Sequence, residues 1–252
     1  LMTLGSSAMY VVSVVLPTVQ ADFGAARADA SLPYTLLMVG FGLGGILMGR
    51  LADRYGLMTV VMIGAGGLGA GYIGAGLAGN LWVYALIHGV LLGALGSAAT
   101  FAPLVADTSL WFVRRRGIAV AVCASGNYLA GAIWPPVVQH FIALYGWRPT
   151  FIGLGVLCLV AMPLLALLLR ERPPVAAAPS VAPAGGAMPS SRPFGLSLNQ
   201  AQLLLCVAGV ACCVAMSMPQ VHIVAYCTDL GFGAARGAEM LSLMLACGIV
   251  SR

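Results

Sequence analysis

Long apolar segments, separated by short turns that hold most of the charge, limit most strongly how this chain can fold. The predicted spans cover residues 2–20, 32–51, 57–79, 81–105, 117–144, 148–169, 200–227 and 238–252. An α-helix needs about 20 apolar residues to cross the roughly 30 Å hydrocarbon core of a bilayer. Only 8% of the 252 residues are charged, whereas a soluble domain carries about 25%. The sequence therefore predicts an all-α membrane protein whose main partner is the lipid bilayer.

The basic residues predict how these spans are oriented. All twelve are arginine, and the connections after the second, fourth and sixth spans carry eight of them: Arg50, Arg54, Arg114, Arg115, Arg116, Arg170, Arg172 and Arg192. The connections after the other spans carry three: Arg27, Arg148 and Arg236. Because cytoplasmic loops are enriched in basic residues, the N-terminus is predicted to be cytoplasmic. This placement accounts for the net charge of +5, so nucleic acid is not an expected partner.

A proline-rich segment divides the chain. Residues 171–198 combine six prolines with Ala, Ser and Gly, a composition typical of an extended linker. We therefore predict an N-terminal six-helix bundle (1–170), a cytoplasmic linker (171–198) and the start of a C-terminal bundle (199–252), in a chain truncated at both ends. A weak internal repeat agrees, since Ala25-Ala26-Arg27 matches Ala234-Ala235-Arg236 at an offset of 209. Parallel repeats of this kind occur in transporters.

Three overlapping copies of G-x-G-x-x-G lie in span three and start at Gly64, Gly69 and Gly74. A dinucleotide site would need a preceding strand and an acidic residue about 20 positions on, and the sequence offers neither. Missing side chains instead let helices approach closely in lipid. The spans also hold no paired acids, metal-spaced histidines or nucleophile–base set. We therefore expect no cofactor, no metal site and no enzymatic activity.

The turn after span two reads Gly49-Arg50-Leu51-Ala52-Asp53-Arg54-Tyr55-Gly56. It resembles the signature turn of the major facilitator superfamily, G-x-L-A-D-R-x-G, although Leu57 and Met58 stand where a basic pair usually follows. The resemblance implies the major facilitator fold and a conformational latch between the two bundles. The latch residues would be Gly49, Asp53, Arg54 and Gly56. Asp107, near the cytoplasmic end of span four, is either a solvated helix cap or the ion-pair partner of Arg54 in this latch.

A second resemblance surrounds span five. Residues 112–119 (FVRRRGIA), 125–127 (SGN), 135–136 (PP) and 145–148 (YGWR) are similar to this region of the monocarboxylate and oxalate/formate transporter branch. The first-span motif of the animal monocarboxylate carriers is not present in this sequence, which favours a bacterial relative in the inner membrane. The resemblance implies a monomeric, alternating-access transporter of a small organic anion, expected to be a monocarboxylate, with H⁺ symport as its drive.

The resemblance predicts that Arg252 binds the substrate. An arginine inside the membrane is costly and marks a functional site by default. In the monocarboxylate and oxalate branch, an arginine in span eight pairs with the substrate carboxylate. Gly248 replaces the Asp that animal carriers have one turn earlier, which argues against proton coupling through such a pair. Alternatively, Arg252 marks the cytoplasmic end of a short helix.

Three further polar side chains are candidate substrate contacts. Asn127 would lie about 15 Å from the cytoplasmic arginines, where it either bonds a neighbouring helix or lines a cavity. His222, which follows Pro219, is either an internally satisfied group or a cavity wall and proton site. Tyr10 lies on a span that lines the central cavity in this superfamily. Two other functions stay open: efflux of a hydrophobic drug, which would favour aromatic and Met contacts, and a receptor of the same fold that binds ligand without transport.

Overall fold

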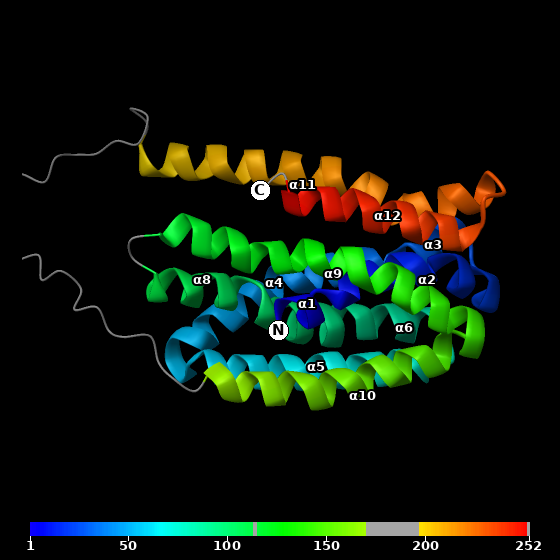
Figure 1. Ribbon diagram of the computed structural model, residues 1–252, viewed down its shortest axis with the longest axis horizontal. Coiled ribbons are helices and arrows are strands. Elements are labelled where there is room, and N and C mark those ends of the chain that lie inside the picture. The colour runs from blue at the N-terminus through cyan, green and yellow to red at the C-terminus, as the bar shows by residue number, and fades with distance from the viewer. Residues whose placement is uncertain (113–114, 170–196, 251–252) are drawn as a thin grey trace, which may run out of the picture.

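The computed structural model describes residues 1–112, 115–169 and 197–250. In these ranges the chain forms helices and no strand, and the long helices lie along one axis (Figure 1). The helices are α1 (Met2–Gly5), α2 (Ser7–Phe23), α3 (Arg27–Ala30), α4 (Leu32–Tyr55), α5 (Leu57–Gly76), α6 (Leu81–Ile87), η1 (His88–Ser97), α7 (Ala98–Thr100), α8 (Ala102–Trp111), α9 (Arg116–Tyr145), α10 (Trp147–Ala166), η2 (Leu167–Leu169), α11 (Leu198–Asp229) and α12 (Gly233–Val250). The predicted all-α class is confirmed.

Seven helical stretches of the described chain are long and apolar enough to cross a membrane. They follow the first seven predicted spans in order, and some combine several helices: Met2–Phe23 joins α1 and α2, and Leu81–Trp111 joins α6, η1, α7 and α8. α12 runs through the eighth predicted span as far as Val250. The predicted linker lies almost entirely outside the described residues. The chain is described again from Ser197, whose side chain forms a capping box with Gln200 at the start of α11.

The turns gather at two opposite ends of the molecule (Figure 1). The α4–α5 turn at Gly56 and the α8–α9 connection lie at one end, here called the arginine-rich end. The turns at Gly24, Gly146 and Gly231 lie at the other, here called the opposite end. The predicted topology requires this separation of the two sets of connections. That the arginine-rich end faces the cytoplasm stays a prediction.

Glycines bring several spans into backbone contact. A side chain at Gly40 would meet the carbonyl of Gly89, and one at Gly44 would meet the backbone of Ala94, so α4 and η1 touch through their main chains. An added Cβ would come within 3.0 Å of a neighbouring helix at five glycines of span three: Gly64, Gly67, Gly69, Gly71 and Gly76. For these positions the predicted role in helix packing is confirmed.

The middle of span four is a π-helix, η1, where the sequence suggested an ordinary helical span. In a π-helix each N–H bonds the carbonyl five residues back, which widens the turn. Gly93 and Gly96 of this segment pack closely on Leu37 of α4 and Leu68 of α5, respectively. We attribute the widened turn to these two close contacts, which a periodicity argument cannot detect.

Candidate functional site

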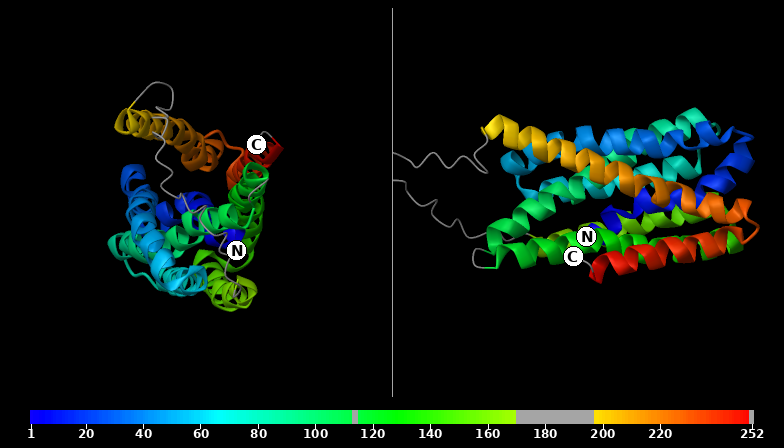
Figure 2. Two further views of the ribbon diagram at one scale, coloured as in Figure 1. Left: turned by 90° about the vertical axis from the view of Figure 1, so that its left-hand side faces the viewer. Right: turned by 90° about the horizontal axis from the view of Figure 1, so that it is seen from above.

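α9 contacts helices that come from both sides of the predicted linker. At Gly131, the ring of Tyr10 from α2 and the side chain of Leu245 from α12 occupy the space that a Cβ would need. One position further, Ser242 of α12 donates a hydrogen bond to the carbonyl oxygen of Ala132. Seen end-on in Figure 2, α11 and α12 lie together on one side of the earlier spans. α9 is therefore a main point of contact between the two predicted bundles.

Tyr128 joins three helices at one point. Its ring packs on Gly248 of α12, where an added Cβ would lie 2.7 Å from a ring carbon. Its hydroxyl donates to the sulfur of Met216 on α11 at 3.9 Å. Neither Tyr128 nor Met216 is among the predicted site residues, because an aromatic and a methionine in an apolar span are typical of core residues. The one sequence signal for Tyr128 is its position next to Asn127.

Asn127 is partly buried on α9. Its Oδ1 atom is enclosed and accepts no hydrogen bond from the described residues. Leaving a buried amide oxygen unpaired costs about 1–3 kcal/mol, so most such atoms in native structures find a partner. Asn127 was predicted either to bond a neighbouring helix or to line a cavity. Among the described residues, no hydrogen bond from a neighbouring helix reaches its Oδ1 atom.

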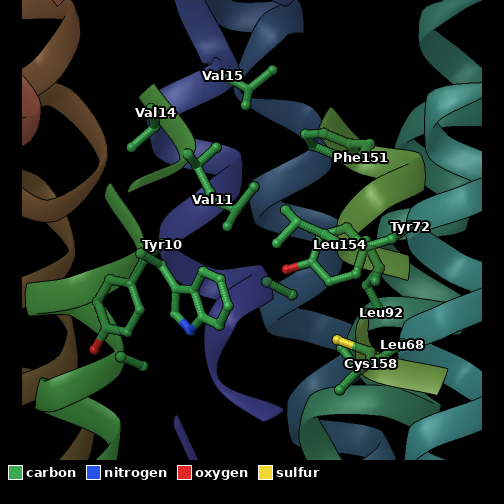
Figure 3. Packing of buried hydrophobic residues seen from close by; sticks show 14 of the residues in the cluster. Tyr10, Val11, Val14, Val15, Leu68, Tyr72, Leu92, Phe151, Leu154 and Cys158 are labelled. Atoms are coloured by element: carbon green, nitrogen blue, oxygen red, sulfur yellow. The ribbon is translucent and has the colours of Figure 1, made fainter. Parts of the chain in front are cut away.

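Tyr10 and His222 occupy different environments. Tyr10 is 4% exposed, and in Figure 3 it points away from Tyr72 and Cys158, on the side where it meets Gly131 of α9. His222 is exposed on α11, three residues after the intrahelical Pro219. Of the two, only Tyr10 is enclosed by neighbouring helices, and the roles assigned to both residues stay predictions.

Arg252, the predicted anion ligand, lies outside the described residues. The last helix is described as far as Val250. Leu241 and Leu245 of this helix are buried in the main hydrophobic core together with residues of the earlier spans. Gly248 lies against Tyr128. The pairing of Arg252 with the substrate therefore stays a prediction.

The predicted latch turn is formed by the end of α4 and the start of α5. Gly56 separates the two helices with φ +88°, a conformation that strongly favours glycine. Asp53 and Arg54 are both exposed, and the Arg54 guanidinium lies 5.4 Å from the centre of the Tyr55 ring. An added Cβ at Gly49 would meet nothing within 4 Å. Gly56 is therefore required by backbone geometry, whereas Gly49 has no packing role within the described chain.

Asp107 does not pair with Arg54 among the residues that the structure describes. Its carboxylate instead accepts a hydrogen bond from the indole N–H of Trp111, one turn later on α8, at 3.0 Å. The alternative of a local helix-end contact describes this arrangement better than the alternative of an ion pair. A latch that uses Asp107 would have to break this hydrogen bond first.

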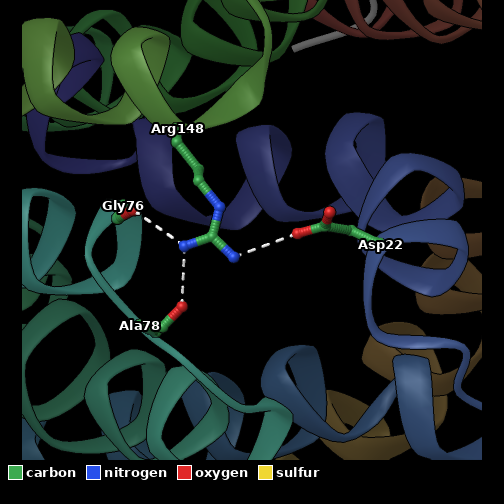
Figure 4. A network of polar contacts seen from close by, with 4 residues as sticks. All are labelled: Asp22, Gly76, Ala78 and Arg148. Carbon is green, nitrogen blue, oxygen red and sulfur yellow. Dashed lines mark hydrogen bonds and ion pairs between the residues drawn. The ribbon is translucent and has the colours of Figure 1, made fainter.

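A polar cluster at the opposite end was not selected as a site from sequence. Arg148 forms an ion pair with Asp22 at 3.0 Å and donates to the carbonyls of Gly76 and Ala78 at 3.4 and 2.8 Å (Figure 4). Its guanidinium also lies 4.5 Å from the centre of the Trp147 ring. Arg148 thus ties together the ends of α2, α5 and α10. The sequence signal was the YGWR segment, noted above only as part of a resemblance.

The described residues contain no group of three or more His, Cys, Asp or Glu side chains that could hold a metal ion. The polar groups that approach one another near α9 are instead hydroxyl, amide and thioether groups. Such groups can bind and orient a small solute, and they provide no nucleophile–base pair.

These features define a polytopic membrane protein in which two groups of spans meet along α9. The sequence profile of the Major Facilitator Superfamily matches residues 1–252. The chain belongs to this family, and its fold is a partial major facilitator fold.

Several curated proteins are similar to the chain. Human "Monocarboxylate transporter 11" is 30% identical over 203 residues, which cover 79% of this chain and 41% of the relative. "Monocarboxylate transporter 4" of Rattus norvegicus is 28% identical over 237 residues, covering 92% and 50%. "Probable sulfoacetate transporter SauU" of Cupriavidus necator is 28% identical over 163 residues, covering 64% and 37%. The chain spans about half or less of the length of these relatives.

Proposed function

We propose that the protein is a secondary transporter that moves a small organic anion, most simply a monocarboxylate, by alternating access. The observation that carries this proposal is the convergence at α9 of Tyr10 from α2, Met216 from α11 and Gly248 from α12. Transporter folds built from repeats bind their substrates near the midplane, where the repeats meet. The names of the similar proteins, which refer to monocarboxylates and sulfoacetate, support an organic anion as the substrate.

Arg252 is proposed to bind the anionic group. The spacing in the sequence supports this assignment, because positions 241, 245, 248 and 252 would share one face if the α-helical periodicity continued to Arg252. Leu241 and Leu245 are buried, and Gly248 contacts Tyr128 of α9. A guanidinium can donate two parallel hydrogen bonds to a carboxylate, which a lysine ammonium cannot reproduce.

Asn127 and Tyr10 are proposed to complete the anion site. The Asn127 amide has an enclosed oxygen without a partner among the described residues, and rotating the amide by half a turn exchanges this oxygen for the NH₂ group. The NH₂ group would donate to a carboxylate. The oxygen, by contrast, would accept from a hydroxyl or a protonated acid.

Symport with H⁺ is proposed as the driving reaction. His222 is the candidate proton carrier, because an imidazole is the side chain whose charge ordinarily changes between pH 5 and 8. It lies on α11, three residues after the intrahelical Pro219. Gly248 has no side chain that could take this role.

The turn at the arginine-rich end is proposed to control closure of the cytoplasmic side. Gly56 fixes the turn, and Asp53 and Arg54 are exposed beside it. Their charges can therefore pair with groups presented by a second bundle. Asp107 would join this latch after releasing Trp111. We further propose a monomer in a bacterial inner membrane with a cytoplasmic N-terminus, on the basis of the arginine distribution.

The decisive experiment is uptake of radiolabelled lactate or pyruvate by the protein expressed from its complete gene. Arg252→Lys should lower kcat/KM about 10- to 100-fold, because one charge-assisted hydrogen bond contributes about 1.5–3 kcal/mol. Arg236→Lys is the matched control, since Arg236 pairs with Glu239 on an exposed helix end, and it should leave uptake unchanged. Saturable uptake that is indifferent to Arg252→Lys would contradict the anion site.

Efflux of a hydrophobic solute is the second candidate function. The contact between the Tyr128 hydroxyl and the Met216 sulfur favours it, because aromatic and methionine side chains adapt to apolar ligands. Tyr128→Ala would then abolish efflux of a hydrophobic dye, and Arg252→Lys would leave it intact. Specific ligand binding without flux in the same cells would instead indicate a receptor.

A further inference from the structure

A groove of about 480 Å³ opens between α9 and α10 near the opposite end of the molecule. Its walls include Trp134 and Phe141 from α9 and Leu154 and Leu157 from α10. Gly153 lies in the middle of the α10 wall, and an added Cβ there would meet nothing within 4 Å. The absence of a side chain at this position therefore keeps the groove open.

Two polar groups on the groove walls already have partners. The Thr150 hydroxyl donates to the carbonyl of Gly146 at 2.7 Å. The indole N–H of Trp134 donates to the carbonyl of Thr3 at 2.8 Å. The wall residues named above otherwise offer hydrocarbon, so the groove suits an apolar occupant without hydrogen-bonding groups.

The length and position of the groove match one leaflet of a bilayer. Both walls belong to membrane-spanning helices, Arg116–Tyr145 and Trp147–Leu169. The groove runs from Tyr145 at the helix end to Trp134, eleven residues earlier, which is about 16 Å of α-helix. Half of the hydrocarbon core is about 15 Å thick. Tyr145 is 66% exposed at the mouth, where a tyrosine suits the interface between lipid and water.

The described residues that line the groove all belong to α9 and α10, and none of them belongs to α12. We propose that the groove binds one acyl chain of a phospholipid from the leaflet at the opposite end of the molecule. This inference does not depend on the proposed transport function. The bound chain fills the gap between α9 and α10 and supports the indole that contacts Thr3.

The test uses the protein expressed from its complete gene, in vesicles of phosphatidylethanolamine and phosphatidylglycerol. A fraction of the phosphatidylethanolamine carries a photoreactive diazirine midway along one acyl chain, and labelled peptides are mapped by mass spectrometry. We expect labelling on residues 134–157 above that of the other lipid-facing helices. Gly153→Leu should lower this labelling about fivefold or more, because its side chain takes the space of the acyl chain.

Gly66→Leu on α5 is the matched control. Gly66 is also exposed, and an added Cβ there meets nothing within 4 Å, so this variant should keep the labelling of residues 134–157. Equal labelling of these residues in the Gly153→Leu variant and the unmodified protein overturns the proposal. Labelling no higher than elsewhere on the surface also overturns it, since another segment of the protein would then cover the groove.

Discussion

The charged side chains at the two ends of the helical bundle make different kinds of contact. At the opposite end, Arg148 is held by Asp22, by two carbonyl oxygens and by the Trp147 ring. These contacts join α2, α5 and α10, three helices that are far apart in the sequence. The charge at this end is therefore used inside the bundle to fix its helices together.

At the arginine-rich end, Arg54, Asp107 and Arg116 make polar or ring contacts with described residues that are close to them in sequence. Arg54 lies beside Tyr55, and Asp107 bonds Trp111 one turn away. Arg116 likewise donates to Ser109, seven residues earlier. These local contacts leave the charges able to pair with another part of the protein. The two ends therefore differ in whether their charged groups connect separate helices, and the latch proposed for the arginine-rich end would use charges without such cross-bundle contacts to described residues.

Replacing Arg148 should have the largest effect on stability and tests whether its contacts fix the opposite end. Arg148→Met should lower the free energy of unfolding by about 2–4 kcal/mol, because hydrogen bonds to a charged group contribute about 1.5–3 kcal/mol and a half-exposed ion pair adds at most about 1 kcal/mol. Thermal unfolding in detergent, followed by circular dichroism, measures the loss. Arg236→Met is the control, since its exposed pair with Glu239 predicts a loss below about 0.5 kcal/mol. Equal losses in the two variants would show that Arg148 does not fix this end.

The glycines of two similar turns, one at each end, allow a direct comparison of stability losses, which are expected to be smaller than that of Arg148→Met. Gly56 and Gly146 connect consecutive helices at the two ends with nearly the same geometry, φ +88° and ψ +162° against φ +83° and ψ +168°. Alanine at either position should cost about 1–3 kcal/mol, because residues with a Cβ rarely adopt this conformation. Equal shifts in melting temperature are expected if backbone strain alone decides. A much smaller loss for Gly56→Ala would show that the turn at the arginine-rich end relaxes more readily.

The sequence predicted most of the fold because the membrane imposes simple rules. Long apolar runs located the first seven spans, and arginine placement separated the two sets of turns that the structure places at opposite ends. The π-helix η1 was missed, and its Gly93 and Gly96 lie in close contact with other spans. Hydrophobic periodicity reads one helix at a time and carries no such information.

The candidate site could be predicted only in part, for a related reason. Polar residues in apolar spans are conspicuous, so Asn127 and His222 could be selected from the sequence. Tyr128 and Met216 gain their interest only from meeting each other across two helices. Arg148 likewise shows its importance through partners more than 70 positions away in sequence, such as Asp22. Pairings of this length depend on tertiary packing, and one sequence alone does not reveal them.

Asp53→Asn should have the smallest effect on stability. It tests directly whether a charge at the arginine-rich end serves transport without contributing to stability. Asp53 is exposed, with no hydrogen bond or ion pair to another described residue, so the change in unfolding free energy should stay within about 0.5 kcal/mol. If its charge closes the cytoplasmic side, uptake by the protein expressed from its complete gene should nevertheless fall about tenfold, the equivalent of 1.4 kcal/mol in the switching equilibrium. Parallel measurements of melting temperature and initial uptake rate separate the two effects. Unchanged uptake would remove Asp53 from the latch and leave the arginine-rich end without its proposed function.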